Sequence, residues 1–107
     1  MFKSMKLTVS ALFVAGLMAT APAMADQALA QKSNCLACHS KDKAVVGPAF
    51  ADIAKKYAGD ANAVKTLSAK VKAGGSGTWG AIPMPPNATI SDADVETLVK
   101  WILAGAN

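Results

Sequence analysis

The chain has 107 residues, 17% of which are charged, and its 11 lysines against seven acidic residues give a formal charge of +4. Lys3 and Lys6 lie in the N-terminal stretch, so from Asp26 onward nine lysines face seven acids and the excess falls to +2. So small an excess argues against a nucleic-acid groove, which needs a concentrated basic stripe.

Residues 1–25 have the pattern of a cleaved secretory signal peptide. Lys3 and Lys6 form a basic region, residues 7–19 carry no charge, and Ala23-Met24-Ala25 supplies a small-x-small cleavage site. The apolar run is shorter than the ~20 residues of a membrane span, although an uncleaved anchor is the alternative. We expect export and cleavage after Ala25, which leaves residues 26–107 as one domain without stable membrane insertion.

The exported part predicts an all-α fold of about four short helices. The first runs from Asp26 to about Asn34, and the second runs from Ala49 to Tyr57 with apolar residues at i, i+3, i+4 and i+7. Asp60 is expected to cap the third helix, which Gly74 ends. The fourth begins at Ser91, an N-cap residue, and ends at Gly105. No segment shows sustained alternation of the kind that indicates a strand.

The stretch Cys35-Leu36-Ala37-Cys38-His39 reads C-x-x-C-H, the attachment signature of c-type haem. Each thiol can form a thioether with a porphyrin vinyl group, and the imidazole can ligate the iron. On a helical turn, residues three and four apart share a face, so Cys38 and His39 lie on the face of Cys35.

A C-x-x-C pair has three other interpretations: a thioredoxin-like redox pair, half of a zinc site, or a structural disulfide. Zinc needs about four ligands, whereas this stretch holds both cysteines and the single histidine of the whole chain. The redox pair expects a βαβ context that the surrounding sequence lacks. We therefore predict one covalently attached haem.

The segment Gly74–Asn87 joins the third and fourth helices. Its first half is rich in glycine, and prolines stiffen its second half, where Pro83 and Pro85 flank Met84. The other four methionines all precede residue 26, so Met84 is the single methionine of the exported part. With His39 on one face of the iron, Met84 is the one soft side chain left for the other face. The alternative is that Met84 is ordinary apolar filler.

Three separated motifs resemble the small bacterial class I cytochromes c, in particular the cytochrome c-551 (c8) group. They are the C-x-x-C-H stretch, V-G-P-A after it, and W-G-A-I-P-M-P-P-N downstream. The resemblance covers residues 26 onward to the C-terminal helix with Lys100-Trp101. It implies the class I cytochrome c fold around one haem c, in a soluble, monomeric, periplasmic one-electron carrier that is not an enzyme.

The resemblance also implies roles for three further residues. The carbonyl of Pro48 would accept the Nδ1 proton of His39, which fixes the tautomer of a metal-bound histidine. Asn87 would hydrogen-bond near the Met84 sulfur, and the Trp79 indole N–H would contact a haem propionate. Plainer interpretations are that Pro48 starts a helix and that Trp79 packs in the core. Asn87 could likewise merely end the proline-rich second half of Gly74–Asn87, which we call the strap.

Two positions depart from the pattern of the group. Lys70 stands where an arginine often contacts a propionate, and lysine lacks the planar fork of arginine. Lys70 is therefore a candidate contact and equally a solvated helix residue. Ala81 stands where the strap often has another proline, which predicts a slightly less rigid strap.

The implied function is electron transfer from a cytochrome bc complex or similar donor to a nitrite reductase, terminal oxidase or peroxidase. Axial Met84 would raise the reduction potential and leave no open iron site for a substrate. Two alternatives are a haem-based sensor or peroxidase in which Met84 is displaced, and a thiol oxidoreductase that uses Cys35 and Cys38.

An apolar collar is expected around the haem edge, with Lys41 and Lys43 as a basic rim. The alternative is that these apolar residues are ordinary core, above all Ile82. The predicted members of the collar are Leu36, Ala37, Val45, Val46, Ile82, Pro83, Pro85 and Pro86.

Overall fold

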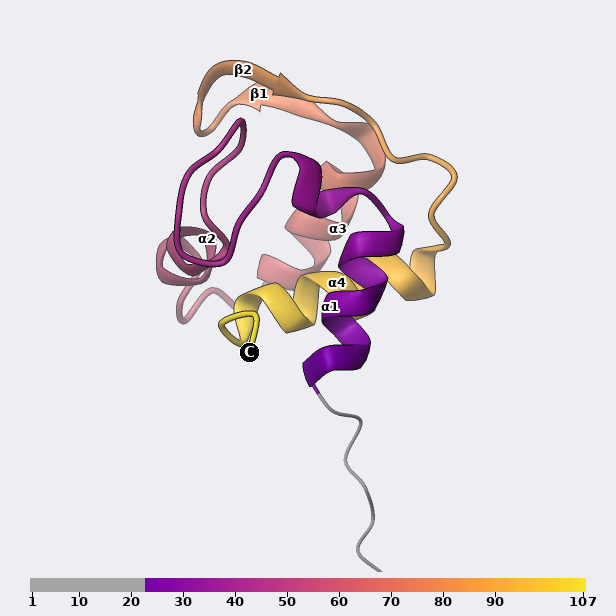
Figure 1. Ribbon diagram of the computed structural model, residues 1–107. Helices are drawn as coiled ribbons and strands as arrows, with labels where there is room; N and C mark the ends of the chain where they lie inside the picture. Colours follow the sequence, from indigo (N-terminus) through magenta and orange to yellow (C-terminus); the bar gives the residue numbers. More distant parts are fainter. Residues whose placement is uncertain (1–22) are drawn as a thin grey trace, which may run out of the picture.

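The computed structural model describes residues 23–107, so the predicted signal peptide falls almost wholly outside the described residues. The first described helix, α1, spans Ala23–Lys32 and begins before the expected Asp26 (Figure 1). The 3₁₀ turn η1, Cys35–Ala37, follows and contains the first cysteine of the C-x-x-C-H stretch. Two residues separate the end of α1 from the haem motif, so the motif begins close to the predicted helix end at about Asn34.

All four predicted helices are present in the described part of the chain. Helix α2 spans Phe50–Lys56, with Ala49 and Tyr57 as its capping residues, which matches the predicted range. Helix α4 spans Asp92–Leu103. Its N-cap is Ser91, whose side chain accepts a hydrogen bond from the Asp94 N–H at 3.2 Å, as the capping pattern predicts.

Helix α3 spans Ala63–Ala73 and begins later than predicted. Asp60 is not its N-cap, because its Oδ1 accepts from the Asn62 N–H at 2.8 Å in a turn that precedes the helix. Asn62 occupies the cap position, without a side-chain hydrogen bond. Gly74 is the C-cap residue, as predicted, and its φ of 70° is a conformation that favours glycine.

The prediction that Gly74–Asn87 contains no strand is wrong. Strand β1, Gly75–Gly77, pairs antiparallel with strand β2, Gly80–Met84, and Gly75 lies opposite Met84. The hairpin arches away from α3 and lies at the opposite end of the molecule from the C-terminus (Figure 1). A three-residue Gly-Ser-Gly strand has no apolar alternation, so its sequence carries no strand signal.

Helix α4 organises the core, because it packs against α1, α2 and α3. Its residues Val95, Leu98 and Val99 are buried, as the predicted stripe requires. Trp101 lies outside that stripe and is buried as well, and its ring packs against that of Phe50 in a T-shaped contact with a centroid distance of 5.6 Å. Burying each such side chain contributes roughly 1.5–3 kcal/mol to folding.

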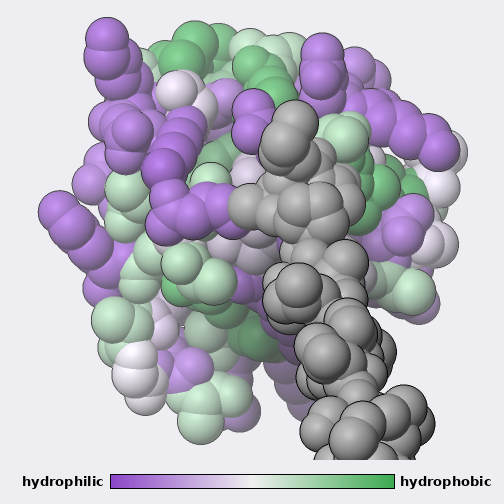
Figure 2. Space-filling model, turned by 60° about the horizontal axis from the view of Figure 1, so that its bottom comes forward, coloured by the Kyte–Doolittle hydropathy of each residue, from purple (hydrophilic) through white to green (hydrophobic). Residues whose placement is uncertain are grey.

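One face of the described chain carries both hydrophilic and apolar residues (Figure 2). Figure 2 shows hydrophilic residues around the end of the molecule where α1 begins, with apolar residues between them. None of the polar or charged residues in the described range is fully buried. No helix within residues 23–107 combines the length and the apolar character that crossing a bilayer requires.

Candidate haem-binding site

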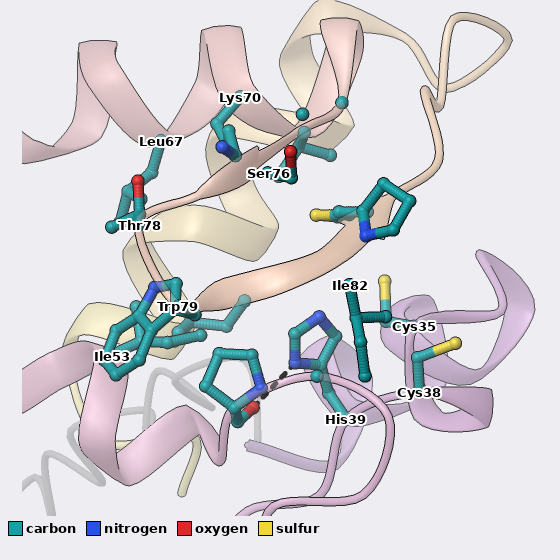
Figure 3. Close-up of a pocket in the computed structure, with 18 of the residues that line it drawn as sticks. Cys35, Cys38, His39, Ile53, Leu67, Lys70, Ser76, Thr78, Trp79 and Ile82 are labelled. Carbon is teal, nitrogen blue, oxygen red and sulfur yellow. Dashed lines mark hydrogen bonds between the residues drawn. The ribbon is translucent and has the colours of Figure 1, made fainter.

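A cavity of about 600 Å³ opens between the C-x-x-C-H stretch, α3 and the hairpin. Figure 3 shows Cys35, Cys38 and His39 together on one side, Trp79 across from them, and Lys70 on the helix above. Most of the remaining wall is apolar and includes Ile53, Leu67, Val71, Leu98, Val99 and Ile102. Apolar slots of this size with a few polar groups are typical of cofactor sites. The wall therefore suits a flat, mostly apolar porphyrin.

The turn at η1 brings the two thiols and the imidazole together. The backbone N–H groups of Cys38 and His39 both donate to the Cys35 carbonyl, at 3.2 and 2.9 Å. Such a turn returns the chain to one face after three residues. Both thiols are free and half-buried, and burial raises the pKa of the Cys35 thiol.

The imidazole of His39 is held by two contacts. Its Nδ1 lies 2.7 Å from the carbonyl oxygen of Pro48, and because a carbonyl only accepts, Nδ1 carries the proton and donates it. The ring stacks on Phe50, with centroids 5.3 Å apart and planes at 21°. Nε2 is then the nitrogen whose lone pair is free to bind a metal.

Met84 ends strand β2, is half-buried and lines the same cavity. The segment after it is pressed against the end of α3. A Cβ on Gly74 would lie 2.5 Å from the Met84 carbonyl oxygen and 2.8 Å from the Pro86 nitrogen. The backbone N–H of Asn87 donates to the Val71 carbonyl at 3.0 Å. The strap that carries Met84 is thus tied to α3 at its base.

The side chain of Asn87 is hydrogen-bonded to two backbone carbonyl groups. Its Nδ2 donates to the carbonyl oxygens of Val71 at 3.2 Å and of Pro85 at 3.3 Å. Asn87 is not among the residues that line the cavity. The structure therefore shows the Asn87 amide bound to the strap and to α3.

The two candidate propionate contacts, Trp79 and Lys70, both line the cavity. Trp79 lies in the turn of the hairpin and is 44% exposed, so it is not a core residue. The Nζ of Lys56 lies 5.3 Å from the centroid of the Trp79 ring, within cation–π range. Lys70 extends from α3 toward the hairpin, where a Cβ on Gly75 would lie 3.0 Å from its Nζ.

Most large members of the predicted collar are exposed. Ile82 is 68% exposed, Val45 is 60% and Val46 is 52%, so the core interpretation fails for them. Figure 3 shows Ile82 on the hairpin beside the two cysteines. Of the predicted basic rim, Lys41 donates from Nζ to the Oδ1 of Asn107.

Sequence reasoning missed the residues that support the ligands. Phe50 was predicted only as an apolar helix residue, although it forms a wall for the imidazole. Gly74 was predicted only as a helix stop, although its missing side chain also makes room for the strap. Lys56 had no signal, because its position over Trp79 depends on how the hairpin folds back.

A small helical fold with two thiols, an oriented imidazole and a thioether around one apolar cavity is that of a c-type haem protein. The chain belongs to the cytochrome c family, and the family model for cytochrome c matches residues 23–106.

Individual relatives are similar over most of the chain. Cytochrome c-551 of Allochromatium vinosum is 59% identical over 87 residues, which cover 80% of this chain and 93% of the relative. Cytochrome c-552 of Nitrosomonas europaea is 54% identical, with coverage of 88% and 86%. The crystal structure of wild-type Nitrosomonas europaea cytochrome c552 is similar with a TM-score of 0.72 and 53% identity, over 74% of this chain and 98% of that one.

These comparisons confirm the resemblance and the mostly helical class I cytochrome c fold. The protein is a mono-haem electron-transfer protein of the cytochrome c-551/c-552 type and not an enzyme. Its cofactor is covalently bound haem c. Its partners are redox proteins, as its role as an electron carrier requires.

Proposed function

We propose that this cytochrome is a periplasmic carrier that passes single electrons from a quinol-linked cytochrome complex to a terminal reductase or oxidase, such as nitrite reductase. Cys35 and Cys38 form the thioether bonds, and His39 and Met84 are the axial ligands. The observation that carries the proposal is the convergence of these four side chains on one cavity.

When bound, the haem supplies an iron that alternates between the ferric and ferrous states. His39 is oriented for it by the Pro48 carbonyl, so Nε2 presents its lone pair in a fixed direction. Met84 supplies a thioether that favours the reduced state, and with both axial positions taken no substrate position is left. The residues therefore favour electron transfer over a sensor or a peroxidase.

Trp79 and Lys70 are the proposed contacts for the propionates, because both line the cavity and both carry N–H donors. Lys56 stands over the Trp79 ring and adds a second positive charge near the same edge. Asn87 is proposed to tune Met84. In the structure its amide instead ties the strap to α3, so its influence on the sulfur would act through the position of the strap.

Partner docking is proposed at the exposed apolar collar around Val45, Val46 and Ile82. Interfaces for electron transfer are small and transient, so a few exposed apolar side chains suffice. Lys43 lies beside this collar in sequence and would steer an acidic partner surface. The carrier acts as a monomer, without nucleic acid and without stable membrane insertion.

Export and cleavage after Ala25 belong to the same proposal. Cleavage there would trim the start of α1 and leave Asp26 near its new N-terminus. A negative charge at a helix N-terminus is favourable because it faces the positive end of the helix dipole.

The first test is the mass and the colour of the purified periplasmic protein. The mass should equal the chain from Asp26 plus one haem, and acid-acetone should leave the colour in the protein. A mass equal to the bare chain, with two thiols open to alkylation, would contradict haem attachment and favour the thiol oxidoreductase.

Met84→Ala tests the distal ligand. The oxidised protein should show the weak near-infrared band of sulfur-to-iron charge transfer, and the variant should lose it while keeping covalent haem. Its reduction potential should fall, and the reduced variant should bind carbon monoxide, because one axial position is open. If the wild-type protein already binds carbon monoxide at neutral pH, the sensor or peroxidase is favoured.

A further inference from the structure

Gly47 lies against the ring of His39. A Cβ built on Gly47 would be 2.5 Å from Cε1, 2.9 Å from Nδ1 and 3.0 Å from Nε2 of the imidazole. These three atoms are consecutive in the ring, so the backbone of residue 47 lies against that part of the imidazole at contact distance. Gly47 is not among the glycines with positive φ. The requirement for glycine here is therefore one of space and not of backbone conformation.

The imidazole has little room to move away from an added methyl group, because its ring also packs against Phe50. The Phe50 ring stacks on it, is only 1% exposed, and is itself packed against Trp101. The hydrogen bond from Nδ1 to the Pro48 carbonyl fixes the ring within its own plane. Close-packed interiors do not absorb an extra methyl group without displacing their neighbours.

The backbone of Gly47 cannot move away either. Its N–H donates to the Cys38 carbonyl at 2.7 Å, and its carbonyl accepts from the Val45 N–H at 3.1 Å. These bonds tie residue 47 to the same turn that carries the C-x-x-C-H stretch. A displacement of Gly47 would therefore weaken these bonds.

We propose that Gly47 is a positioning residue for the axial imidazole. Its backbone and the ring of Phe50 form two walls, called here the imidazole slot, and the slot sets the plane of His39 and the direction of Nε2. This inference rests on the proposed role of His39 as the proximal ligand. It assigns the orientation of that ligand to Gly47 and Phe50 as well as to Pro48.

Gly47→Ala tests the slot in the haem-loaded protein, with Gly59→Ala as the matched control. Gly59 has a φ of +77° and no atom within 4 Å of a built Cβ, so alanine there strains the backbone without touching the site. Two readouts report the imidazole directly: the haem-methyl shift pattern in the proton NMR spectrum of the oxidised protein, and the exchange rate of the Nδ1 proton.

Gly47→Ala should change the methyl pattern and speed Nδ1 exchange by about tenfold or more, because the Pro48 hydrogen bond opens more often. Gly59→Ala should lower the thermal midpoint and leave both readouts at their wild-type values. Wild-type readouts in Gly47→Ala would overturn the inference and leave the proposed function intact. A wild-type protein without a His39 ligand signal would instead overturn the proposed function.

Phe50→Leu keeps the inference testable if Gly47→Ala does not load haem. It leaves Gly47 in place and replaces the ring of Phe50, the other wall of the slot, with a leucine side chain that still fills much of the core. The slot predicts a changed methyl pattern and faster Nδ1 exchange. If Phe50→Leu keeps both readouts unchanged, the Pro48 bond alone orients His39 and the slot has no such role.

Discussion

The two candidate ligands are held in different ways. His39 is fixed by contacts close in sequence, since Pro48 accepts from its ring and Gly47 covers it, and Phe50 then joins it to the buried core. Met84 sits on a hairpin whose strands are exposed apart from Met84 itself. The segment that follows the hairpin contacts the end of α3 at two residues: Val71, through a hydrogen bond, and Gly74, through close packing.

This difference indicates which ligand yields first. Segments with few buried apolar contacts open locally at a lower free energy than the core does. The strap that carries Met84 packs against the rest of the protein at its base, next to α3. Phe50, on which His39 stacks, belongs instead to the main core cluster. We therefore expect damage on the His39 side to unfold the protein, and damage on the Met84 side to change ligation while the fold persists.

The largest stability effect should come from Phe50→Ala. Removing a fully buried aromatic ring costs about 3–5 kcal/mol of unfolding free energy, and this ring also supports the imidazole. Ile82→Ala on the exposed hairpin is the matched change and should cost about 0.5 kcal/mol or less. Guanidinium denaturation followed by far-ultraviolet circular dichroism measures both. Equal losses of unfolding free energy in the two variants would contradict the difference proposed between the core and the hairpin.

Gly74→Ala should have an intermediate effect on stability and a large effect on Met84. Its φ of +70° is strained for alanine, and the new Cβ would press on three backbone atoms of the strap, at a cost of roughly 1–3 kcal/mol. The near-infrared sulfur band should weaken. Gly77→Ala shares the strain, with φ at +103°, but meets no atom within 4 Å, so it should keep the band. A full band in Gly74→Ala would mean that α3 does not position the strap.

Val46→Glu should slow electron transfer to the partner several-fold while the absorption spectrum and the potential stay almost unchanged. Its side chain borders the cavity but is 52% exposed, so the carboxylate can point to solvent on the docking face. Stopped-flow kinetics with the partner measure the effect.

Lys43→Glu should slow transfer less than Val46→Glu does. Its effect should fade as salt rises, since exposed charges are screened beyond ~10 Å at 0.1 M ionic strength. If partner kinetics are untouched in both variants, the electron leaves through another face.

Asn87→Ala should have the smallest effect on the haem. It removes the side-chain bonds to the Val71 and Pro85 carbonyls, at about 1 kcal/mol, and keeps the backbone bond to Val71. The potential should shift far less than in Met84→Ala, and the sulfur band should persist. Loss of the band would show that Asn87 is essential to the Met84 bond.

The sequence predicted the parts of the molecule that depend on local pattern. Helix α4 follows from its apolar stripe and from Ser91, and α2 follows from the spacing of its apolar residues. The burial of Trp101 did not follow, because it depends on Phe50 from another helix. The hairpin did not follow either, since its glycines carry no side-chain pattern.

The residues of the candidate site that carry reactive or ligating side chains could be predicted from the sequence. The residues that act by leaving space for a neighbour could not. Thiols, an imidazole and a lone methionine have few other uses together, so Cys35, Cys38, His39 and Met84 could be named from the sequence. Gly47 and Gly74 act through the absence of a side chain, and a glycine reads the same whether it serves a turn or a close contact. The partner of the Asn87 amide depends on how the strap meets α3, which only the folded chain decides.

The unequal attachment of the two ligands is tested most directly by one denaturation experiment on the oxidised protein. The near-infrared sulfur band and the far-ultraviolet circular dichroism signal are followed in the same guanidinium titration. The band should disappear at a lower guanidinium concentration than the helical signal, because the Met84 strap opens before the core around Phe50 and His39. Coincident loss of the two signals, or an oxidised protein that never shows the band, would contradict the account.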